Sequence, residues 1–211
     1  MGKVIKVSGR GAVDVMPDWV QLHISISDVG TDYEAVLKAS AAMTELARIA
    51  LQRNGFQKED VVTEYFDVVP VYDEGTEAAS GYRYIHCLKL EMPYDNKRLT
   101  ACMTELGKCI TDPEFWVTYT VKDPEATNDM LLAQAVGTAR RKAEILAQAA
   151  GVSLGTIESI EYSWEDREIA SATEPVLAVP SSEERPVRAS MNVVPEKITL
   201  DDMVTVTWEI I

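Results

Sequence analysis

Soft metal ligands are scarce in this chain of 211 residues, which contains three cysteines and two histidines. Cys87, Cys102 and Cys109 show no CxxC spacing, and the histidines form no HxxxH pair, so a structural zinc site is not expected. Cys102 and Cys109 lie seven positions apart on an expected helix, a separation too long for a disulfide. We therefore expect three reduced cysteines that pack as small apolar side chains.

Positive charge is also in short supply, because 34 acidic residues face 20 basic residues and leave a formal net charge of −14. Such a chain repels nucleic acids and anionic membranes, so neither is an expected partner. No apolar run approaches the roughly 18 residues of a membrane span, and the start lacks the apolar core of a secretory signal. The sequence as it stands predicts a cytoplasmic protein, although a chain whose signal peptide had been removed would begin in the same way.

Gly9 and Gly11 interrupt the first apolar stretch, VSGRGAV at residues 7–13. A glycine-rich loop binds phosphate where it leads into a helix, because free backbone N–H groups then face the ligand. Here the next segment, residues 20–26, alternates apolar and polar residues as a strand does. The glycines are therefore expected to form a β-bulge or a tight hairpin and not a nucleotide site.

Strand-like alternation recurs along the chain, and helical periodicity fills three intervals between the strands. The expected strands follow the glycine pair and then occupy residues 61–72, 81–92, 114–121, 155–164 and 203–211. The expected helices span residues 32–54, 96–110 and 124–150; Thr31 and Glu34 match a capping box, and Asp123 with Pro124 marks a helix start. This order predicts a single α+β domain over residues 1–211, with a long, mostly antiparallel sheet covered by three helices.

Residues 165–196 form an irregular arm that contains four of the nine prolines and no sustained periodicity. A segment of that length inside a compact domain is either a plain loop or a surface that a partner orders. Both alternatives remain open from the sequence.

Few residues suggest chemistry. His23 is expected on the exposed face of its strand and His86 in a row of buried side chains, and either would need a positioned carboxylate to act as a general base. No GxSxG segment supplies a nucleophile, and the acidic clusters at 57–60, 72–77, 164–168 and 200–202 lack the register of a calcium loop. The basic residues 140–142 are expected on a solvated face or in a salt bridge between subunits, with Arg141 within reach of Glu144. Three tryptophans are expected to anchor a core or an interface: Trp116, Trp164 and Trp208.

Four segments resemble the SIMPL-domain family, a domain of unknown function whose relatives include bacterial periplasmic immunogenic proteins. They are VSGRGAVDVMPDWVQLHISI (7–26), GYRY (81–84), DPEATNDMLLAQAVGTARRKAEILAQAAGVSLGTIESIEY (123–162) and VTVTWEII (204–211). The most specific parts are the opening VSGxGxVxVxPD and the alanine-rich run at 135–147 followed by GVxLG at 151–155. The resemblance implies an α+β fold, a tendency to oligomerise, and no established activity or cofactor. Many bacterial relatives are exported, whereas no signal is apparent here.

The sequence thus predicts a non-catalytic oligomeric or partner-binding protein, with no catalytic, cofactor-binding or metal-binding residues. We expect a homo-oligomer or a protein partner, because exposed strand edges and an apolar arm invite pairing with another chain. The alternative is a small-molecule-binding protein or a hydrolytic enzyme with a site around His86, which would require a deep pocket and a carboxylate bound to His86.

Overall fold

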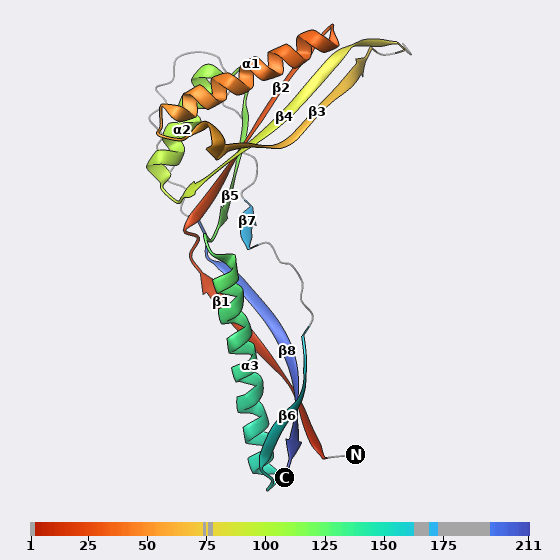
Figure 1. Ribbon diagram of the computed structural model, residues 1–211, viewed down its shortest axis with the longest axis vertical. Coiled ribbons are helices and arrows are strands. Elements are labelled where there is room, and N and C mark those ends of the chain that lie inside the picture. Colours follow the sequence, from red (N-terminus) through yellow and green to blue (C-terminus); the bar gives the residue numbers. More distant parts are fainter. Residues whose placement is uncertain (1–2, 74, 76–77, 163–168, 173–194) are drawn as a thin grey trace. The chain divides into compact units, whose positions relative to one another are not determined.

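The computed structural model describes residues 3–73, 75, 78–162, 169–172 and 195–211. Within these residues the chain forms three α-helices, eight strands and one short 3₁₀ helix (Figure 1). In chain order they are β1 (Val4–Val15), β2 (Trp19–Gly30), α1 (Tyr33–Gln52), η1 (Lys58–Asp60), β3 (Val61–Tyr72), β4 (Ala79–Pro93), α2 (Asn96–Cys109), β5 (Glu114–Thr120), α3 (Pro124–Ala149), β6 (Leu154–Glu161), β7 (Ala170–Ala172) and β8 (Ile198–Ile210).

The predicted α+β class and the three helices are confirmed, and the strands divide into two sheets. One sheet has the order β1-β8-β6 and the other the order β3-β4-β2-β5-β7. The chain correspondingly forms two compact units, one made of Met1–Pro17, Val121–Ala170 and Glu196–Ile211, the other of Asp18–Thr120 and Ser171–Pro195. The single domain over residues 1–211 stays a prediction.

In the first unit, helix α3 covers one face of the three-stranded sheet. Alanines of α3 pack on inward-facing residues of β1 and β8, and the buried set is Val7, Ala135, Ala139, Ala143, Val204, Val206 and Trp208. The other face carries polar cross-strand pairs, such as the hydrogen bond between Ser8 Oγ and Thr205 Oγ1 at 2.9 Å. One face of this sheet is therefore core and the other is polar.

The expected bulge or hairpin at Gly9 and Gly11 is wrong. Strand β1 pairs with β8 in one unbroken antiparallel register from Val4 to Val15, with both glycines inside it. A Cβ added to Gly9 would overlap backbone atoms of Ala135 and Ala139, and one added to Gly11 would overlap the carbonyl oxygen of Leu131. The glycines thus allow close packing, because without side chains at these positions the backbone of α3 can contact the backbone of β1 directly.

Helix α3 begins as predicted, since the Asp123 carboxylate accepts a hydrogen bond from the Ala126 amide at 2.9 Å and Pro124 occupies the first turn. Gly151, with φ 68°, lies just beyond its end. The buried positions of α3 repeat every four residues, and Leu146 is exposed. They are Thr127, Leu131, Ala135, Ala139, Ala143 and Ala147.

In the second unit, α1 and α2 cover one face of the five-stranded sheet (Figure 1). The alternation at residues 20–26 is confirmed, because Val20, Leu22, Ile24 and Ile26 of β2 are buried. The neighbouring strands contribute further buried rows, which are Tyr84, His86, Leu88, Leu90 and Met92 on β4 and Phe115, Val117 and Tyr119 on β5. The predicted hairpin of residues 61–72 and 81–92 corresponds to β3 and β4, which pair antiparallel. Strand β3, which contains Pro70, lies at the edge of the sheet, as a proline in a strand suggests.

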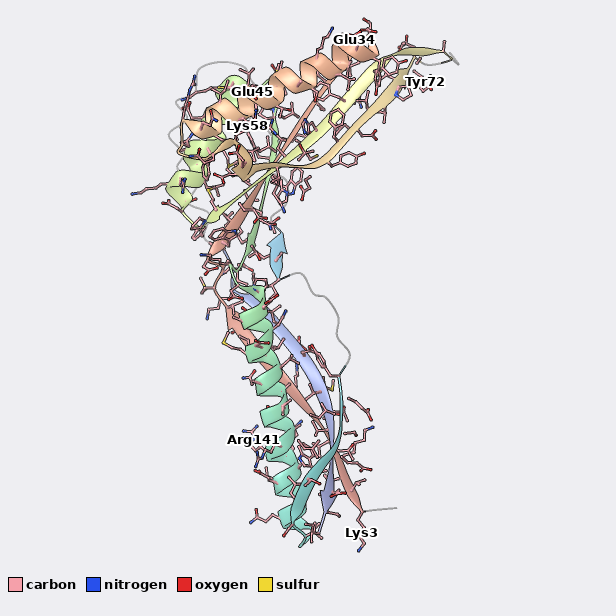
Figure 2. The ribbon with its side chains drawn as sticks, in the orientation of Figure 1. Lys3, Glu34, Glu45, Lys58, Tyr72 and Arg141 are labelled. Carbon is pink, nitrogen blue, oxygen red and sulfur yellow. The ribbon has the colours of Figure 1, made fainter. Side chains whose placement is uncertain are left out.

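Helix α1 corrects two details of the sequence interpretation. Its cap is Asp32, whose carboxylate accepts from the Ala35 amide at 2.9 Å, one position later than the predicted box at Thr31. Its inward face also carries hydroxyls, because Ser40 and Thr44 are buried while Leu46 is exposed. At its other end, Lys58 of η1 pairs with Glu45 of α1 at 3.7 Å (Figure 2).

The arm predicted at 165–196 lies mostly outside the described residues. Its described part includes β7, which is the outermost strand beside β5. The two alternatives for this arm, a plain loop and a segment ordered by a partner, both stay predictions. Among the residues that the structure describes, no helix is long and apolar enough to cross a membrane.

Replacing Gly9 with alanine tests the close contact between β1 and α3. The added methyl group overlaps helix backbone, which cannot rotate away as a side chain can, so we expect Gly9→Ala to lower the free energy of unfolding by about 2 kcal/mol or more. The matched control is Gly137→Ala on α3, where nothing lies within 4 Å of the new Cβ. That change should raise stability by about 0.5 to 1 kcal/mol, because alanine favours a helix interior.

Urea unfolding followed by circular dichroism measures both variants. A Gly9→Ala protein as stable as the wild type would contradict the close packing.

Candidate functional site

His86 is the residue around which the sequence placed an alternative catalytic site, and it is buried with three hydroxyl partners. On β4 it faces the helices, where its Nδ1 lies 2.9 Å from Thr44 Oγ1 and 3.3 Å from Ser40 Oγ. Its Nε2 lies 2.9 Å from Thr63 Oγ1 on β3. The ring of Phe66 packs edge-on at 5.1 Å between centroids.

The hydrogen-bond directions around His86 follow from Thr44. Its hydroxyl donates to the Ser40 carbonyl at 2.8 Å, so it accepts the proton of His86 Nδ1, and Nε2 accepts from the Thr63 hydroxyl. Burial lowers the pKa of His86, and the nearby positive charge of Arg48 lowers it further. His86 is therefore a neutral imidazole that joins α1 to the edge strand β3.

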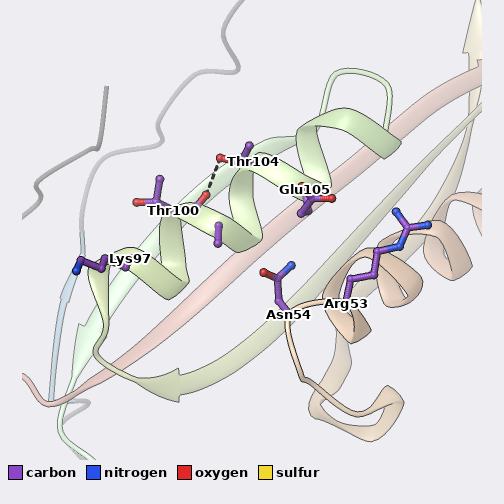
Figure 3. A pocket seen from close by; sticks show the side chains of 7 residues that line it. Arg53, Asn54, Lys97, Thr100, Thr104 and Glu105 are labelled. Atoms are coloured by element: carbon purple, nitrogen blue, oxygen red, sulfur yellow. Dashed lines mark hydrogen bonds between the residues drawn. The ribbon is translucent and has the colours of Figure 1, made fainter. Parts of the chain in front are cut away.

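Nothing in the described surroundings of His86 matches the geometry of a hydrolytic site. The expected carboxylate is replaced by the hydroxyls of Ser40 and Thr44, which cannot stabilise an imidazolium as an aspartate does. A groove of about 500 Å³ does occur, but it lies between the end of α1 and helix α2 (Figure 3). Its lining is Arg53, Asn54, Lys97, Thr100, Ala101, Thr104 and Glu105.

His23 was expected on a solvated surface, and this expectation is wrong. Only 6% of its surface is exposed, although it lies on the sheet face opposite the helices. Its Nδ1 is 2.8 Å from Glu64 Oε2, its Nε2 is 3.2 Å from Thr118 Oγ1, and its ring stacks on Trp116 at 4.8 Å and 4°. The ring of Trp116 covers the imidazole, which explains the burial.

Glu64 reaches His23 because it occupies a β-bulge. The register of β3 against β4 shifts between Thr63 and Tyr65, so Glu64 is the extra residue of the edge strand. Its carboxylate crosses β4 to reach β2, with 38% of the side chain exposed. This carboxylate–imidazole pair has the composition of a general base; here both ring nitrogens have hydrogen-bond partners, and the pair joins the edge strand β3 to β2.

The cysteines are free, as predicted, with Cys102 buried and Cys87 and Cys109 half-buried. Burial raises the pKa of Cys102 to about 11 and also raises that of Cys87, so both remain protonated thiols near neutral pH. A thiol is a poor nucleophile compared with a thiolate. Their observed roles are those of small apolar side chains.

Several other charged groups form ion pairs. Arg140, and not Arg141, pairs with Glu144 at 3.0 Å, while Arg141 lies on the exposed side of α3 (Figure 2). Asp201, from the acidic cluster at 200–202, pairs with Arg10 at 3.1 Å. Within the described ranges, no group of three or more His, Cys, Asp or Glu residues is arranged to hold a metal ion.

The tryptophans occupy different environments. Trp208 is buried in the core under α3, whereas Trp116 lies half-buried on the helix-free face of the other sheet. Trp164 lies outside the described residues, as does most of the acidic segment 164–168.

Strand β3 exposes several large apolar side chains. It is the outermost strand of its sheet, paired only with β4 among the described residues. Its exposed large side chains are Val62, Tyr65, Phe66, Val69 and Tyr72. An edge with unpaired backbone groups and aromatic side chains is a template for another strand.

In the edge strand β1, side chains of α3 bind backbone groups. The Ala12 amide donates to Gln134 Oε1 at 2.6 Å, and the Ser8 carbonyl accepts from Lys142 Nζ at 3.0 Å. Both side chains come from α3, so they occupy backbone groups that a further strand would need. Strand β6, the opposite edge, is short and interrupted by two register shifts.

Comparison with known proteins was made on the whole chain. The family model SIMPL, described as a protein of unknown function (DUF541), matches residues 5–208. The chain is also similar to the uncharacterized protein YggE of Edwardsiella ictaluri, with 25% identity over 214 residues that cover 99% of this chain and 87% of that protein.

The neutral state of His86 predicts a dependence of stability on pH. An unfolded chain protonates this histidine at its ordinary pKa of about 6.5, whereas the folded protein resists protonation, so stability falls as pH drops below about 7. We expect His86→Asn to flatten this fall between about pH 7 and pH 5. Arg48→Gln removes the repelling charge and should flatten it in part.

Urea midpoints at several pH values measure these slopes. Parallel slopes in the wild type and His86→Asn would show that His86 is not held neutral.

Proposed function

We infer that this chain, which belongs to the SIMPL family of unknown function, is a non-catalytic oligomeric or partner-binding module. The observation that carries the inference is the edge strand β3, whose free side exposes apolar and aromatic side chains over most of its length. Burying such a surface against another chain is favourable, at about 25 cal/mol per Å² of apolar area removed from water.

The contrast among the described edges supports β3 as the binding edge. Lys142 and Gln134 occupy outward backbone groups of β1, and β6 is interrupted by register shifts. Proteins use such devices to prevent unwanted strand pairing. The long edge of β3 retains apolar side chains on both of its faces, as a surface used for binding would.

The alternative of small-molecule binding or hydrolysis around His86 receives less support. His86 contacts hydroxyls in place of the required carboxylate, and the groove between α1 and α2 contains neither histidine. The two imidazoles instead hold β3: Thr63 binds His86 and Glu64 binds His23, on opposite faces of the sheet. This supports a role in which the position of β3 matters.

Light scattering after size exclusion tests the oligomeric form of the proposal. If β3 mediates self-assembly, the wild type has a mass of at least twice 23.3 kDa, and Phe66→Lys, which places a charge on the exposed β3 edge, shifts that mass towards the monomer. The control is Met203→Lys, at an exposed residue on the central strand β8 of the other sheet, which should leave the mass unchanged.

If the wild type is a monomer, the oligomeric form of the proposal is wrong and only binding to a different protein remains. The partner-binding form requires a protein captured from cell lysate by the wild type and by Met203→Lys but not by Phe66→Lys. Absence of both self-assembly and β3-dependent capture would overturn the proposed function.

A further inference from the structure

The part of β3 best suited to pair with another strand is Tyr65–Val69. These residues keep an unbroken register with β4, from the pair Tyr65↔Cys87 to the pair Val69↔Arg83. The bulge at Glu64 ends the regular run on one side, and Pro70, which has no amide hydrogen, ends it on the other. The backbone groups of this run therefore follow the regular spacing that a neighbouring strand needs. One of them, the Val68 amide, is bound by the Asp67 carboxylate at 2.8 Å and must exchange that partner when a strand pairs here.

The side chains of this run form two rows. Tyr65, Asp67 and Val69 lie on the helix-free face of the sheet, because Tyr65 is opposite Cys87 in a register that alternates faces. Phe66 lies on the helix-covered face, where it contacts His86. Tyr65 is 50% exposed and Phe66 44%, so each row offers an aromatic surface.

Asp67 places a negative charge at the centre of the run. Its carboxylate accepts hydrogen bonds from Tyr65 Oη at 3.0 Å and from the Val68 amide at 2.8 Å, and within the described residues it pairs with no lysine or arginine. Residues 61–72 contain no basic residue, and the whole chain carries a formal charge of −14. The edge is therefore acidic as well as apolar.

This charge disfavours a second copy of the chain as the occupant. Two β3 edges side by side would bring acidic strands together, and like charges on adjacent strands are destabilising. The basic edge strand is β1, with Lys6 and Arg10, but its Ser8 carbonyl and Ala12 amide are already bound by side chains of α3. Of the remaining described edges, β6 is interrupted by two register shifts and β7 has three residues, so none of the four edges of a second copy offers β3 an unoccupied, regular basic strand.

We propose that β3 binds an extended basic segment of another protein, which adds a strand alongside Tyr65–Val69. A lysine or arginine of that segment lies on the helix-free face beside Asp67, and apolar or aromatic residues on its other face contact Phe66. Backbone hydrogen bonds supply the affinity, and the charge supplies the preference for a basic partner. This inference rests on the partner-binding form of the proposed function and names its partner class.

Fluorescence anisotropy with synthetic peptides tests the proposal on the full chain. The probe is a short peptide in which lysine alternates with valine and threonine. One matched peptide carries glutamate in place of lysine, and another keeps the lysines but has proline at alternate positions. We expect the chain to bind the first peptide at least about tenfold more tightly than either matched peptide.

Charge variants identify the binding edge. Asp67→Lys should weaken binding of the lysine peptide by about tenfold or more, and Asp67→Asn by less, with a weaker dependence on salt. The matched control is Glu158→Lys, which makes the same charge change at an exposed position of the edge strand β6. We expect its binding to stay within about twofold of the wild type, since β6 is not the docking edge.

Three results would overturn this inference: equal weakening by Asp67→Lys and Glu158→Lys, equal binding of the proline peptide, or tight binding of the glutamate peptide. Thermal unfolding checks that the variants fold, and Asp67→Asn keeps the test valid if Asp67→Lys does not. A chain that assembles by light scattering yet ignores the lysine peptide refutes this inference alone. A monomer that shows no β3-dependent capture refutes the proposed function.

Discussion

Backbone N–H and C=O groups at the edge of a sheet need partners, and this requirement shapes both units of the molecule. Each sheet is covered by helices on one face, so its edges must be satisfied in other ways. In the first unit, Lys142 and Gln134 extend from α3 to bind the edge of β1. In the second unit, β3 is held inward by its bulge and by two histidines while its outer side stays available.

The two histidines act on the same short piece of β3 from opposite faces. Thr63 binds His86 on the helix-covered face, and the next residue, Glu64, binds His23 on the other face. Both imidazoles are buried, one beside helix hydroxyls and the other beneath Trp116. An edge strand without such contacts would fray more easily than the strands inside the sheet, because its backbone is bonded on one side alone. Here the bulge is fixed in place, and the run from Tyr65 onward begins at a defined position.

Much of the fold could be predicted from the sequence, because period-two alternation and helical periodicity follow directly from which side chains face the core. The strand rows at Val20–Ile26 and Tyr84–Met92 came out as expected. The predictions for His23 and for the glycines of β1 were wrong because both environments depend on tertiary contacts. Local sequence around His23 contains no sign of Trp116 or Glu64, which arrive from β5 and β3. The glycines in β1 looked like a break because their partner, α3, lies more than a hundred residues later in the chain.

Some of these contacts did leave a trace in the sequence. Ser40 and Thr44, four residues apart on α1, are polar at inward positions, and this pattern signals a buried polar partner such as His86. The alanine-rich run of α3 is a pattern that permits close approach, and the strand positions that receive it are the glycines. Read together, the two patterns would have located the contact. Glu64 had no comparable signal, since a bulge depends on the strand paired beside it.

The contacts between α3 and β1 have a further consequence for chain length. Lys142 and Gln134 are eight helical residues apart, about 12 Å, and they bind Ser8 and Ala12, which are four strand residues apart, about 13 Å. The two elements thus run in opposite directions, and four residues of the helix span about the same length as two residues of the strand. Lengthening this unit while keeping these contacts would require that ratio, because a single residue inserted between the two contacts in either element would shift one of them out of alignment.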